Sequence, residues 1–285
     1  MAGTNERARR RARERHEQQR QIRLERYRRN RKRAGISLVV LCVLGLAVGL
    51  SVAFIGGGTP KAAPKPKASA TATASATASA AAVTEPAHHC TYTSTTSGST
   101  PSLPTSSPDY TASYTATINT NRGPIKINLL NSKATCTVNS FVHLASTNFF
   151  NKTQCWRVDN SDGLYMLQCG DPTATATSKL SCSSSTLGEG GPGYEFDDEN
   201  LKGATYNAGT VAMANGGANT NGSQFFLVFK NTTLPASYTP FGTITSGLNI
   251  LQNVAKAGTT CTIPSVGGGV PKEKVIVDSV TIRKN

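Results

Sequence analysis

The sequence is poor in the side chains that most enzymes use for acid–base, nucleophilic or metal chemistry. It has only four histidines, and three of them, His16, His88 and His89, precede the part of the chain that is rich in apolar runs. The fourth, His143, falls on the polar side of a predicted helix, a position typical of a solvated residue. A Ser–His–Asp or Cys–His arrangement needs an imidazole as general base. The sequence therefore argues against a hydrolase of that kind.

Metal-binding and phosphate-binding patterns are also missing. The seven cysteines include no C-x-x-C pair, and the His-His-Cys run at 88–90 has no fourth ligand nearby. The acids at Glu195–Glu199 are crowded into one loop, whereas a catalytic carboxylate pair needs two different environments. The GEGGPG run at 188–193 lacks the Lys-Ser/Thr ending of a phosphate loop. We therefore expect neither a metal nor a cofactor.

The positive charge of the chain is concentrated at its beginning. Residues 1–33 carry fourteen Lys and Arg against four acids, and so contribute +10 of the formal net charge of +14. The high whole-chain pI is thus a property of this tail rather than of the rest of the chain. We expect no nucleic-acid partner, although the tail's charge favours attraction to acidic lipid.

An uncharged segment follows the basic tail. Ala34–Ile55 has 22 residues without a charge, enough at about 1.5 Å per residue to cross roughly 30 Å of hydrocarbon. The alternative is a cleaved signal peptide with a weak cleavage site at Ser51–Ala53, but its apolar region would be only about 7–15 residues long. Because the basic side stays in the cytoplasm, we expect a single-pass cell-membrane anchor with a cytoplasmic tail and an extracytoplasmic remainder.

Residues 56–108 consist largely of Ala, Thr, Ser, Pro and Gly and offer no apolar face for burial. This composition is typical of a disordered tether. One cysteine, Cys42, lies in the anchor, and the other six follow it, an even number that fits disulfides in an oxidising compartment. Six cysteines allow many connectivities. We expect Cys90 to join the end of the tether to the following domain.

Residues 109–285 alternate short apolar runs with turns, which predicts a mainly β domain. Helices are predicted at 136–146 and 247–258, the first with an apolar stripe formed by Val138, Phe141, Val142 and Ala145. The predicted strands are the two arms of a hairpin within 114–130, then 155–158, 164–170, 209–215, 223–229, 240–245 and 275–282. A long Gly-rich loop is expected at 186–201. These elements predict a closed eight-stranded antiparallel β-barrel capped by two α-helices.

Four stretches stand out in this domain: Arg157, LYMLQCGD at Leu164–Asp171, VAMANGGANTNGSQFF at Val211–Phe226 and FGTI at Phe241–Ile244. Each is weak alone, but together and in this order they resemble the cyclophilin family of peptidyl-prolyl isomerases. The resemblance covers Tyr114–Ile282 and implies an eight-stranded antiparallel barrel capped by two helices. That fold agrees with the one predicted from the periodicity.

The resemblance also implies the residues of the active site. Catalytic roles are carried over to Arg157, Gln168 and Phe226. Substrate-binding roles are carried over to Tyr165, Met166, Ala214, Asn215, Gln224, Leu234 and Tyr238. A guanidinium near the prolyl nitrogen favours the twisted state of an X-Pro bond. The apolar residues would hold the proline ring, and the amides would fix the flanking peptide.

The chain departs from the family's pattern at several of these positions. Trp156 stands where relatives often have histidine before the arginine, Tyr165 replaces a pocket phenylalanine, and Tyr238 replaces a pocket histidine. Thr233 stands where many eukaryotic members have the tryptophan used for cyclosporin, so strong cyclosporin binding is not expected.

The stretch Thr173–Thr186 resembles an insertion before the Gly-rich loop. Its Cys182 suggests a disulfide that holds this loop. For a second pair, the hypothesis is Cys155 with Cys169, which sit on consecutive predicted strands near the groove.

These observations predict a monomeric, membrane-tethered, extracytoplasmic peptidyl-prolyl isomerase that acts on Pro-containing polypeptides and assists the folding of exported proteins. Two alternatives remain. One is a non-catalytic module on the same fold that only holds Pro-containing segments. The other is a structural envelope protein whose basic tail binds acidic lipid or nucleic acid.

Overall fold

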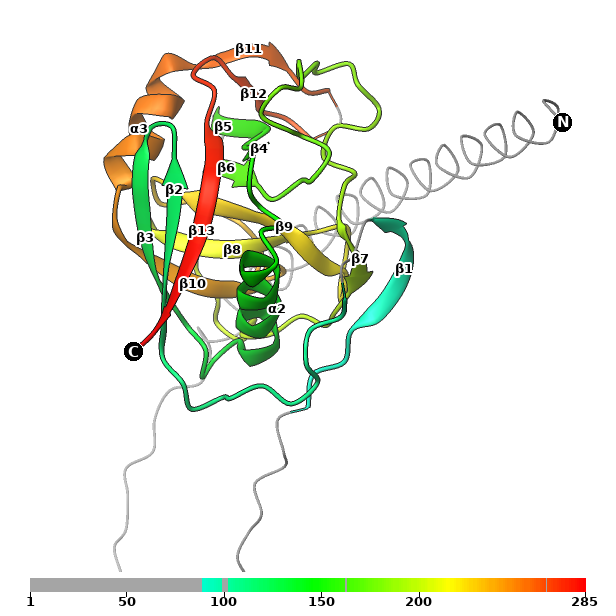
Figure 1. Ribbon diagram of the computed structural model, residues 1–285. Helices are drawn as coiled ribbons and strands as arrows, with labels where there is room; N and C mark the ends of the chain where they lie inside the picture. Colours follow the sequence, from blue (N-terminus) through cyan, green and yellow to red (C-terminus); the bar gives the residue numbers. More distant parts are fainter. Residues whose placement is uncertain (1–88, 99–101, 162, 265) are drawn as a thin grey trace, which may run out of the picture. The chain divides into compact units, whose positions relative to one another are not determined.

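The computed structural model describes residues 89–98, 102–161, 163–264 and 266–285. These residues form a mainly β arrangement with two α-helices, α2 (Thr135–Ser146) and α3 (Leu248–Ala257) (Figure 1). The expected basic tail, the expected anchor and most of the expected tether lie outside this range. Within the range, no helix has both the length and the apolar character needed to cross a membrane.

Most strands belong to one antiparallel sheet. Their order across it is β11 (Thr259–Thr262), β12 (Gly269–Pro271), β5 (Arg157–Ser161), β6 (Leu164–Cys169), β9 (Asn221–Val228), β8 (Thr210–Asn215), β10 (Pro240–Ser246), β3 (Gly123–Leu129), β2 (Tyr114–Thr120), β13 (Ile276–Lys284) and β4 (Thr153–Gln154). The eight strands expected from the sequence are all present. The short strands β4, β11 and β12 bring the sheet to eleven strands.

The pairing order is open, with β11 at one end and β4 at the other, whereas a closed barrel was expected. The chain nevertheless leads directly from β4, at one end of this order, to β5, near the other end, because only Cys155 and Trp156 separate the two strands. The Cys155 N–H bonds to the carbonyl of Val275 at 2.9 Å, and the Trp156 N–H bonds to that of Gln168 at 3.0 Å. The stretch between β4 and β5 therefore bonds through Cys155 to the residue before β13 and through Trp156 to β6.

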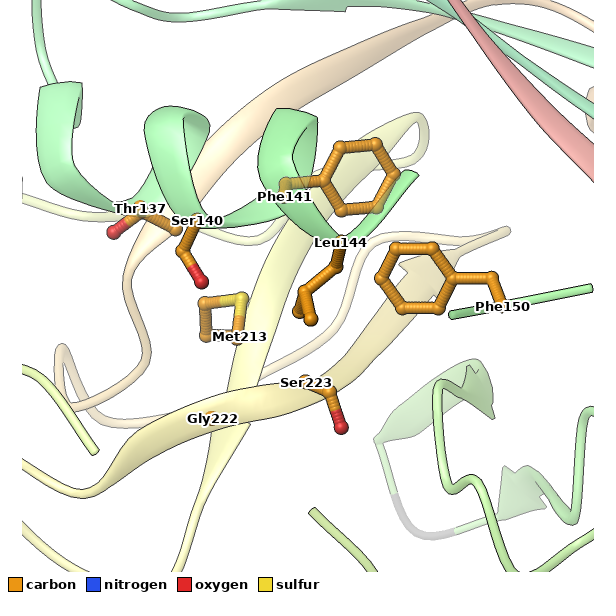
Figure 2. Close-up of a pocket in the computed structure, with 8 residues that line it drawn as sticks. All are labelled: Thr137, Ser140, Phe141, Leu144, Phe150, Met213, Gly222 and Ser223. Atoms are coloured by element: carbon orange, nitrogen blue, oxygen red, sulfur yellow. The ribbon is translucent and has the colours of Figure 1, made fainter. Parts of the chain in front are cut away.

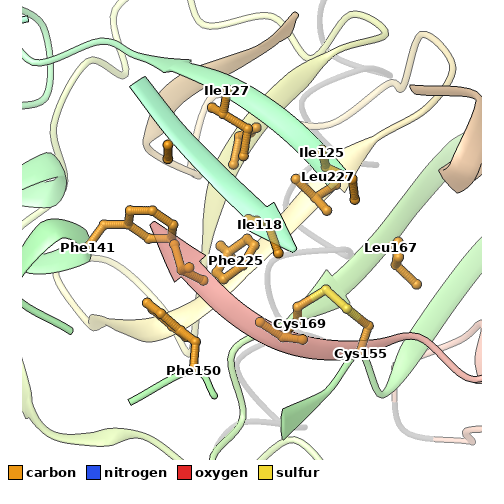
Figure 3. Packing of buried hydrophobic residues seen from close by; sticks show 14 of the residues in the cluster. Ile118, Ile125, Ile127, Phe141, Phe150, Cys155, Leu167, Cys169, Phe225 and Leu227 are labelled. Atoms are coloured by element: carbon orange, nitrogen blue, oxygen red, sulfur yellow. A yellow bond between two sulfur atoms is a disulfide. The ribbon is translucent and has the colours of Figure 1, made fainter. Parts of the chain in front are cut away.

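The core lies between the inner face of the sheet and helix α2. Along the hairpin β2–β3, buried Ile118 and Ile125 lie directly opposite each other, as the alternation of apolar residues predicts. The Phe141 ring on α2 lies 5.5 Å from the Phe225 ring on β9, measured between ring centroids (Figure 3). It lies 5.3 Å from the Phe241 ring on β10. This aromatic cluster attaches helix α2 to strands β9 and β10 of the sheet.

Helix α2 begins at a carboxylate from the acidic loop. The side chain of Glu199 accepts hydrogen bonds from the backbone N–H groups of Cys136 (3.0 Å) and Thr137 (2.7 Å). A carboxylate in this place satisfies unpaired N–H groups and interacts favourably with the helix dipole. At least one acid of the Glu195–Glu199 run is therefore structural.

The described chain is ordered before the expected domain boundary at Asp109. Strand β1 (Thr93–Gly98) pairs with β7 (Pro192–Glu195), a strand within the stretch expected to be a Gly-rich loop. Tyr92 explains much of this difference, because its hydroxyl donates to the carbonyl of Cys136 at 2.8 Å and its ring packs on Tyr194 and Phe196. One aromatic residue thus anchors a segment whose composition is otherwise typical of a tether.

Three disulfides connect the described cysteines. Cys90 pairs with Cys136, which confirms that the end of the tether is joined to the domain. Cys155 pairs with Cys169 beside Leu167 in the core, as hypothesised (Figure 3). Cys182 pairs with Cys261, which confirms that the inserted loop is held by a disulfide and shows that strand β11 holds it.

Candidate active site

Neighbouring strands bring the predicted catalytic residues to one face of the sheet. Arg157 on β5 lies directly opposite Gln168 on β6, and Gln168 lies directly opposite Phe226 on β9. Side chains alternate along each strand, so directly opposed residues share a face. The intervening Leu167 and Phe225 belong to the main core. Arg157, Gln168 and Phe226 therefore form one row on the outer face.

A continuous chain of hydrogen bonds runs through the polar part of this row. Arg157 Nη1 donates to Gln168 Oε1 at 3.2 Å, and Gln168 Nε2 donates to Gln224 Oε1 at 3.0 Å. Both Arg157 and Gln168 are less than 10% exposed, at 9% and 8%. The guanidinium is thus held beside an amide that is itself oriented by a second amide.

The side chain of Gln224 has all of its hydrogen-bonding positions occupied. Its Oε1 also accepts from Trp156 Nε1 at 3.0 Å, and its Nε2 donates to the carbonyls of Gly188 (2.9 Å) and Gly190 (2.8 Å). A side-chain amide offers two acceptor sites and two N–H donors. In this geometry Gln224 orients Gln168 and bonds to two carbonyls of the glycine loop, and its role in substrate binding stays a prediction.

The other edge of the guanidinium is also bound. Arg157 Nη2 lies 3.3 Å from Asp159 Oδ2 and 2.6 Å from the carbonyl oxygen of Val266, and Nε donates to the carbonyl of Gly267 at 2.9 Å. Burial lowers the pKa of Arg157 below its usual value, and the charge of Asp159 raises it again. An arginine remains charged under these conditions because its reference pKa is above about 12.

An apolar cluster lies beside the polar row. Met166, Phe226, Tyr206, Ala212 and Val228 are buried in it, and Leu164, Ala204, Ala214, Leu234 and Tyr238 are partly buried against them. The Phe226 and Tyr238 rings meet edge to face, with centroids 5.6 Å apart. Predicted pocket residues from four separate segments are thus brought together on the same face as Arg157.

Tyr165 does not join this cluster. It follows the alternation of β6 and packs against the main core, with its ring centroid 6.2 Å from that of Phe229. Lys230 Nζ lies 4.4 Å from the centroid of the Tyr165 ring, a cation–π contact. The structure therefore separates Tyr165 from Met166, its expected partner in the proline pocket.

Ala214 and Asn215 lie at the end of β8. Ala214 packs against the apolar cluster, and Asn215 Nδ2 donates to the carbonyl of Ser237 at 2.8 Å. This bond holds the segment that carries Tyr238. In the same segment, the hydroxyl of Tyr206 donates to the carbonyl of Tyr238 at 2.8 Å.

Three residues of the site were not found by sequence reasoning. Asp159 was missed because the predicted strand ended at residue 158, whereas β5 continues to Ser161 and places Asp159 on the same face as Arg157. Trp156 was noted only as a departure from the family pattern. Tyr206 lies outside all the predicted strands. Position i+2 on an extended strand was the one available signal, and it points only to Asp159.

Two other places in the described part of the chain, one closely packed and one hollow, lie away from this site. The space between α2, β8 and β9 is filled by its own side chains, among them Phe141, Leu144 and Met213 (Figure 2). A shallow hollow of about 540 Å³ lies along α3 and is lined by Asn253, Lys256, Arg122 and Glu273, among others. Neither contains a residue of the Arg157 row.

The sequence of this chain is similar to those of known peptidyl-prolyl cis-trans isomerases. A family model described as cyclophilin type peptidyl-prolyl cis-trans isomerase/CLD matches residues 115–282. Probable peptidyl-prolyl cis-trans isomerase B of Mycobacterium leprae is 42% identical over 181 residues, covering 59% of this chain and 56% of that protein. Its counterpart in Mycobacterium tuberculosis is 41% identical, with 57% and 52% covered. The chain thus spans about half the length of these curated relatives.

A shorter relative is covered almost completely. Peptidyl-prolyl cis-trans isomerase A of Mycobacterium tuberculosis is 36% identical over 184 residues, covering 59% of this chain and 91% of that protein. Among solved structures, a cyclophilin type peptidyl-prolyl cis-trans isomerase of Cryptosporidium parvum, in the presence of the dipeptide Ala-Pro, is 27% identical. The match has a TM-score of 0.47 and covers 60% of this chain and 99% of the Cryptosporidium parvum chain.

Proposed function

Because the chain belongs to the cyclophilin-type peptidyl-prolyl cis-trans isomerase family, we propose that it catalyses rotation about X-Pro bonds in polypeptides. The observation that carries this proposal is the position of Arg157, bonded to Gln168 and next to the apolar cluster around Met166 and Phe226. A buried cation beside an apolar cluster suits a reaction in which charge shifts within an amide while a proline ring is held.

The chemistry needs no acid, base or metal. An X-Pro bond rotates slowly because amide resonance must be broken, at a barrier of about 20 kcal/mol. A guanidinium near the prolyl nitrogen stabilises the localised lone pair of the twisted state. Uncatalysed rotation at about 10⁻² s⁻¹ and turnover of roughly 10–10³ s⁻¹ would require about 4–7 kcal/mol of preferential stabilisation.

The hydrogen bonds leave specific donors for the substrate. Within the described residues, one Nη1–H of Arg157 and one Nε2–H of Gln168 have no protein acceptor. Both belong to the row on the outer face. We assign these donors to the substrate peptide, and we assign Met166, Phe226, Leu234 and Tyr238 to the proline ring.

The test is isomerisation of a proline peptide by the full-length protein, produced in an oxidising compartment, beside Arg157→Ala. The parent is expected to be active, and the variant to lose at least about tenfold in kcat/KM while keeping its disulfides and a cooperative melt. A folded parent without activity would contradict the proposal and favour a module that only binds Pro-containing segments. Activity retained in the variant would remove Arg157 from the mechanism.

We further propose that the protein is anchored by Ala34–Ile55, with residues 1–33 in the cytoplasm and the isomerase domain outside. The proposal rests on the uncharged 22-residue segment, on the Arg-rich residues before it, and on the three disulfides, which fit an oxidising compartment. Exported Pro-containing polypeptides would then be the substrates, and nucleic acid would not be a partner.

Protease treatment of intact spheroplasts tests this arrangement. The isomerase domain is expected to be digested from outside, while an epitope attached to the N-terminus stays with the membrane and a cytoplasmic marker stays intact. Protection of the domain would contradict the orientation. Loss of the N-terminal epitope from the mature protein would indicate the cleaved signal peptide instead.

A further inference from the structure

We propose that Asp159 is a positioning residue for Arg157, acting together with the main-chain carbonyls of Val266 and Gly267. This inference deepens the proposed isomerase function and rests on it. Asp159 and these two carbonyls bind Nε and Nη2 of the guanidinium, whereas Nη1 faces Gln168.

That edge of Arg157 is bound more extensively than the edge that faces Gln168. Nη2 uses its N–H groups on Asp159 Oδ2 (3.3 Å) and on the Val266 carbonyl (2.6 Å), and Nε uses its own on the Gly267 carbonyl (2.9 Å). The guanidinium is planar, so acceptors along one edge fix both its position and its plane. The remaining Nη1–H is thereby held in one direction, on the outer face of the sheet.

Asp159 is itself held in place. It is 4% exposed, and its Oδ1 accepts a hydrogen bond from the hydroxyl of Ser161 at 2.8 Å. Arg157, Asp159 and Ser161 lie at alternate positions of β5 and so on one face. The carboxylate therefore has one oxygen bonded to Ser161 and the other bonded to Arg157.

The carbonyl-bearing segment can approach this pair because it contains glycine. Gly268 has φ +62°, and a Cβ placed on it would lie 2.6 Å from the Val158 carbonyl oxygen and 3.0 Å from Asp159 Oδ2. A side chain there would push the segment away from β5. The Gly267 N–H bonds to the carbonyl of Ile263 at 3.0 Å, and the Ile263 N–H bonds to the carbonyl of Gly268 at 2.9 Å, so two backbone bonds also hold this segment.

The position of Asp159 distinguishes orientation from mere charge balance. A carboxylate that only neutralised Arg157 could lie anywhere near it, whereas this one shares Nη2 with a backbone carbonyl and leaves Nη1 to Gln168. The bond from Nη2 needs an acceptor and does not need a negative charge. Asparagine can supply that acceptor and can also donate from its amide to the Ser161 hydroxyl.

The experiment compares Asp159→Ala with Asp159→Asn in the full-length protein. Asp159→Ala is expected to lower kcat at least about tenfold with KM changed less than about twofold, and Asp159→Asn to stay within about threefold of the parent. Asp278→Ala is the matched control, because Asp278 pairs only with the exposed Lys152 on the described surface. It is expected to leave both constants unchanged.

Hydrogen exchange of the Arg157 Nε–H, followed by NMR and assigned by its absence in Arg157→Lys, gives a readout independent of activity. Faster exchange in Asp159→Ala but not in Asp159→Asn supports the proposal, even if the parent proves inactive and the proposed function fails. Unchanged exchange in Asp159→Ala overturns it, as does a kcat for folded Asp159→Asn as low as that of Asp159→Ala.

If Asp159→Ala does not fold, Ser161→Ala replaces it. This variant removes only the hydrogen bond that orients the carboxylate, and Ser161 itself is exposed. A two- to threefold loss in kcat, about the effect of one weak hydrogen bond, supports the proposal. A parental kcat together with parental Nε–H exchange overturns it.

Discussion

The indole of Trp156 donates a hydrogen bond of 3.0 Å to Gln224 Oε1, the same oxygen that accepts from Gln168. Trp156 is buried in a second apolar cluster, with Ala174 and Cys182 of the inserted stretch. The indole can pack against residue 188 because that residue is glycine, since a Cβ there would lie 2.5 Å from the ring. A series of contacts therefore connects the inserted stretch to Arg157: the stretch packs on Trp156, Trp156 bonds to Gln224, Gln224 to Gln168, and Gln168 to Arg157.

Gln224→Ala is expected to disturb both ends of this connection. It leaves the indole N–H and one Gln168 N–H without acceptors, and losing such bonds costs about 1–3 kcal/mol for each buried donor. We expect kcat/KM to fall about tenfold. Since Trp156 is the only tryptophan in the chain, its fluorescence reports this site directly, and its emission is expected to shift to longer wavelength.

Gln252→Ala, on the exposed side of α3, is the control for Gln224→Ala. It is expected to leave the emission and the kinetics as in the parent. An unshifted emission spectrum in Gln224→Ala would show that the indole does not depend on this bond.

Arg157→Lys is expected to be nearly as inactive as Arg157→Ala. A lysine ammonium keeps the charge but cannot reach the carbonyls of Val266 and Gly267, Asp159 and Gln168 together. We expect a loss of at least about tenfold in kcat/KM and of about 1–3 kcal/mol in the free energy of unfolding. Kinetic assays and denaturant unfolding measure the two effects.

Arg122→Lys provides the comparison for this substitution. Arg122 is partly exposed and pairs with Glu273, so the change is expected to alter the free energy of unfolding by less than about 1 kcal/mol. Equal losses in the two variants would mean that the bonding pattern around Arg157 has no special role.

The strands and helices could be predicted where apolar residues repeat with the period of the element, because that repeat indicates which side chains are buried. The hairpin of Ile118 and Ile125 and the helix stripe of Val138 and Phe141 appear in the structure because each pattern places apolar residues on one side. Strand β1 was not predictable in this way. Its pairing with β7 depends on Tyr92 and on the Cys90–Cys136 disulfide, and neither forms a periodic pattern.

The candidate site was predictable only through its side chains. Arg157, Gln168, Met166 and Phe226 are brought together as the family resemblance implied. The carbonyls of Val266 and Gly267 could not be predicted, because a backbone acceptor has no signature in the residue type. The place of Gln224 in the substrate groove stays a prediction, and its complete set of protein partners depends on a loop whose path the sequence does not show.

Removing the Cys182–Cys261 disulfide is expected to lower both stability and turnover. The bond closes a separation of 79 residues, and disulfides contribute about 2–4 kcal/mol, largely through the unfolded state. Strand β11, which contains Cys261, leads into the segment whose carbonyls hold Arg157. The double serine variant is therefore expected to melt at a lower temperature and to lose several-fold in kcat.

The double serine variant of Cys90 and Cys136 separates these two effects. Its disulfide closes 46 residues and joins the start of the described chain to α2. We expect a lower melting temperature with kcat unchanged. If both double variants lose kcat equally, the connection from Cys261 to Arg157 is wrong.

Buried tyrosines are expected to limit stability at alkaline pH. Burial raises the pKa of Tyr194 to about 12, against the opposing effect of its hydrogen bond to Ser140, and burial also raises the pKa of Tyr92. In the unfolded chain both titrate near pH 10, at about their reference value. The folded state thus holds these protons more tightly, so their stabilisation is complete below about pH 10 and is lost as the pH rises toward the folded pKa.

For Tyr194 the difference corresponds to roughly 2–3 kcal/mol, lost between about pH 10 and pH 12. Denaturant unfolding at a series of pH values is expected to show a free energy that is flat to about pH 9 and then falls. Tyr194→Phe removes the titrating group and keeps the ring that packs on Tyr92, so its curve is expected to fall less steeply. A parent and variant with the same alkaline slope would show that ionisation of Tyr194 does not limit the fold.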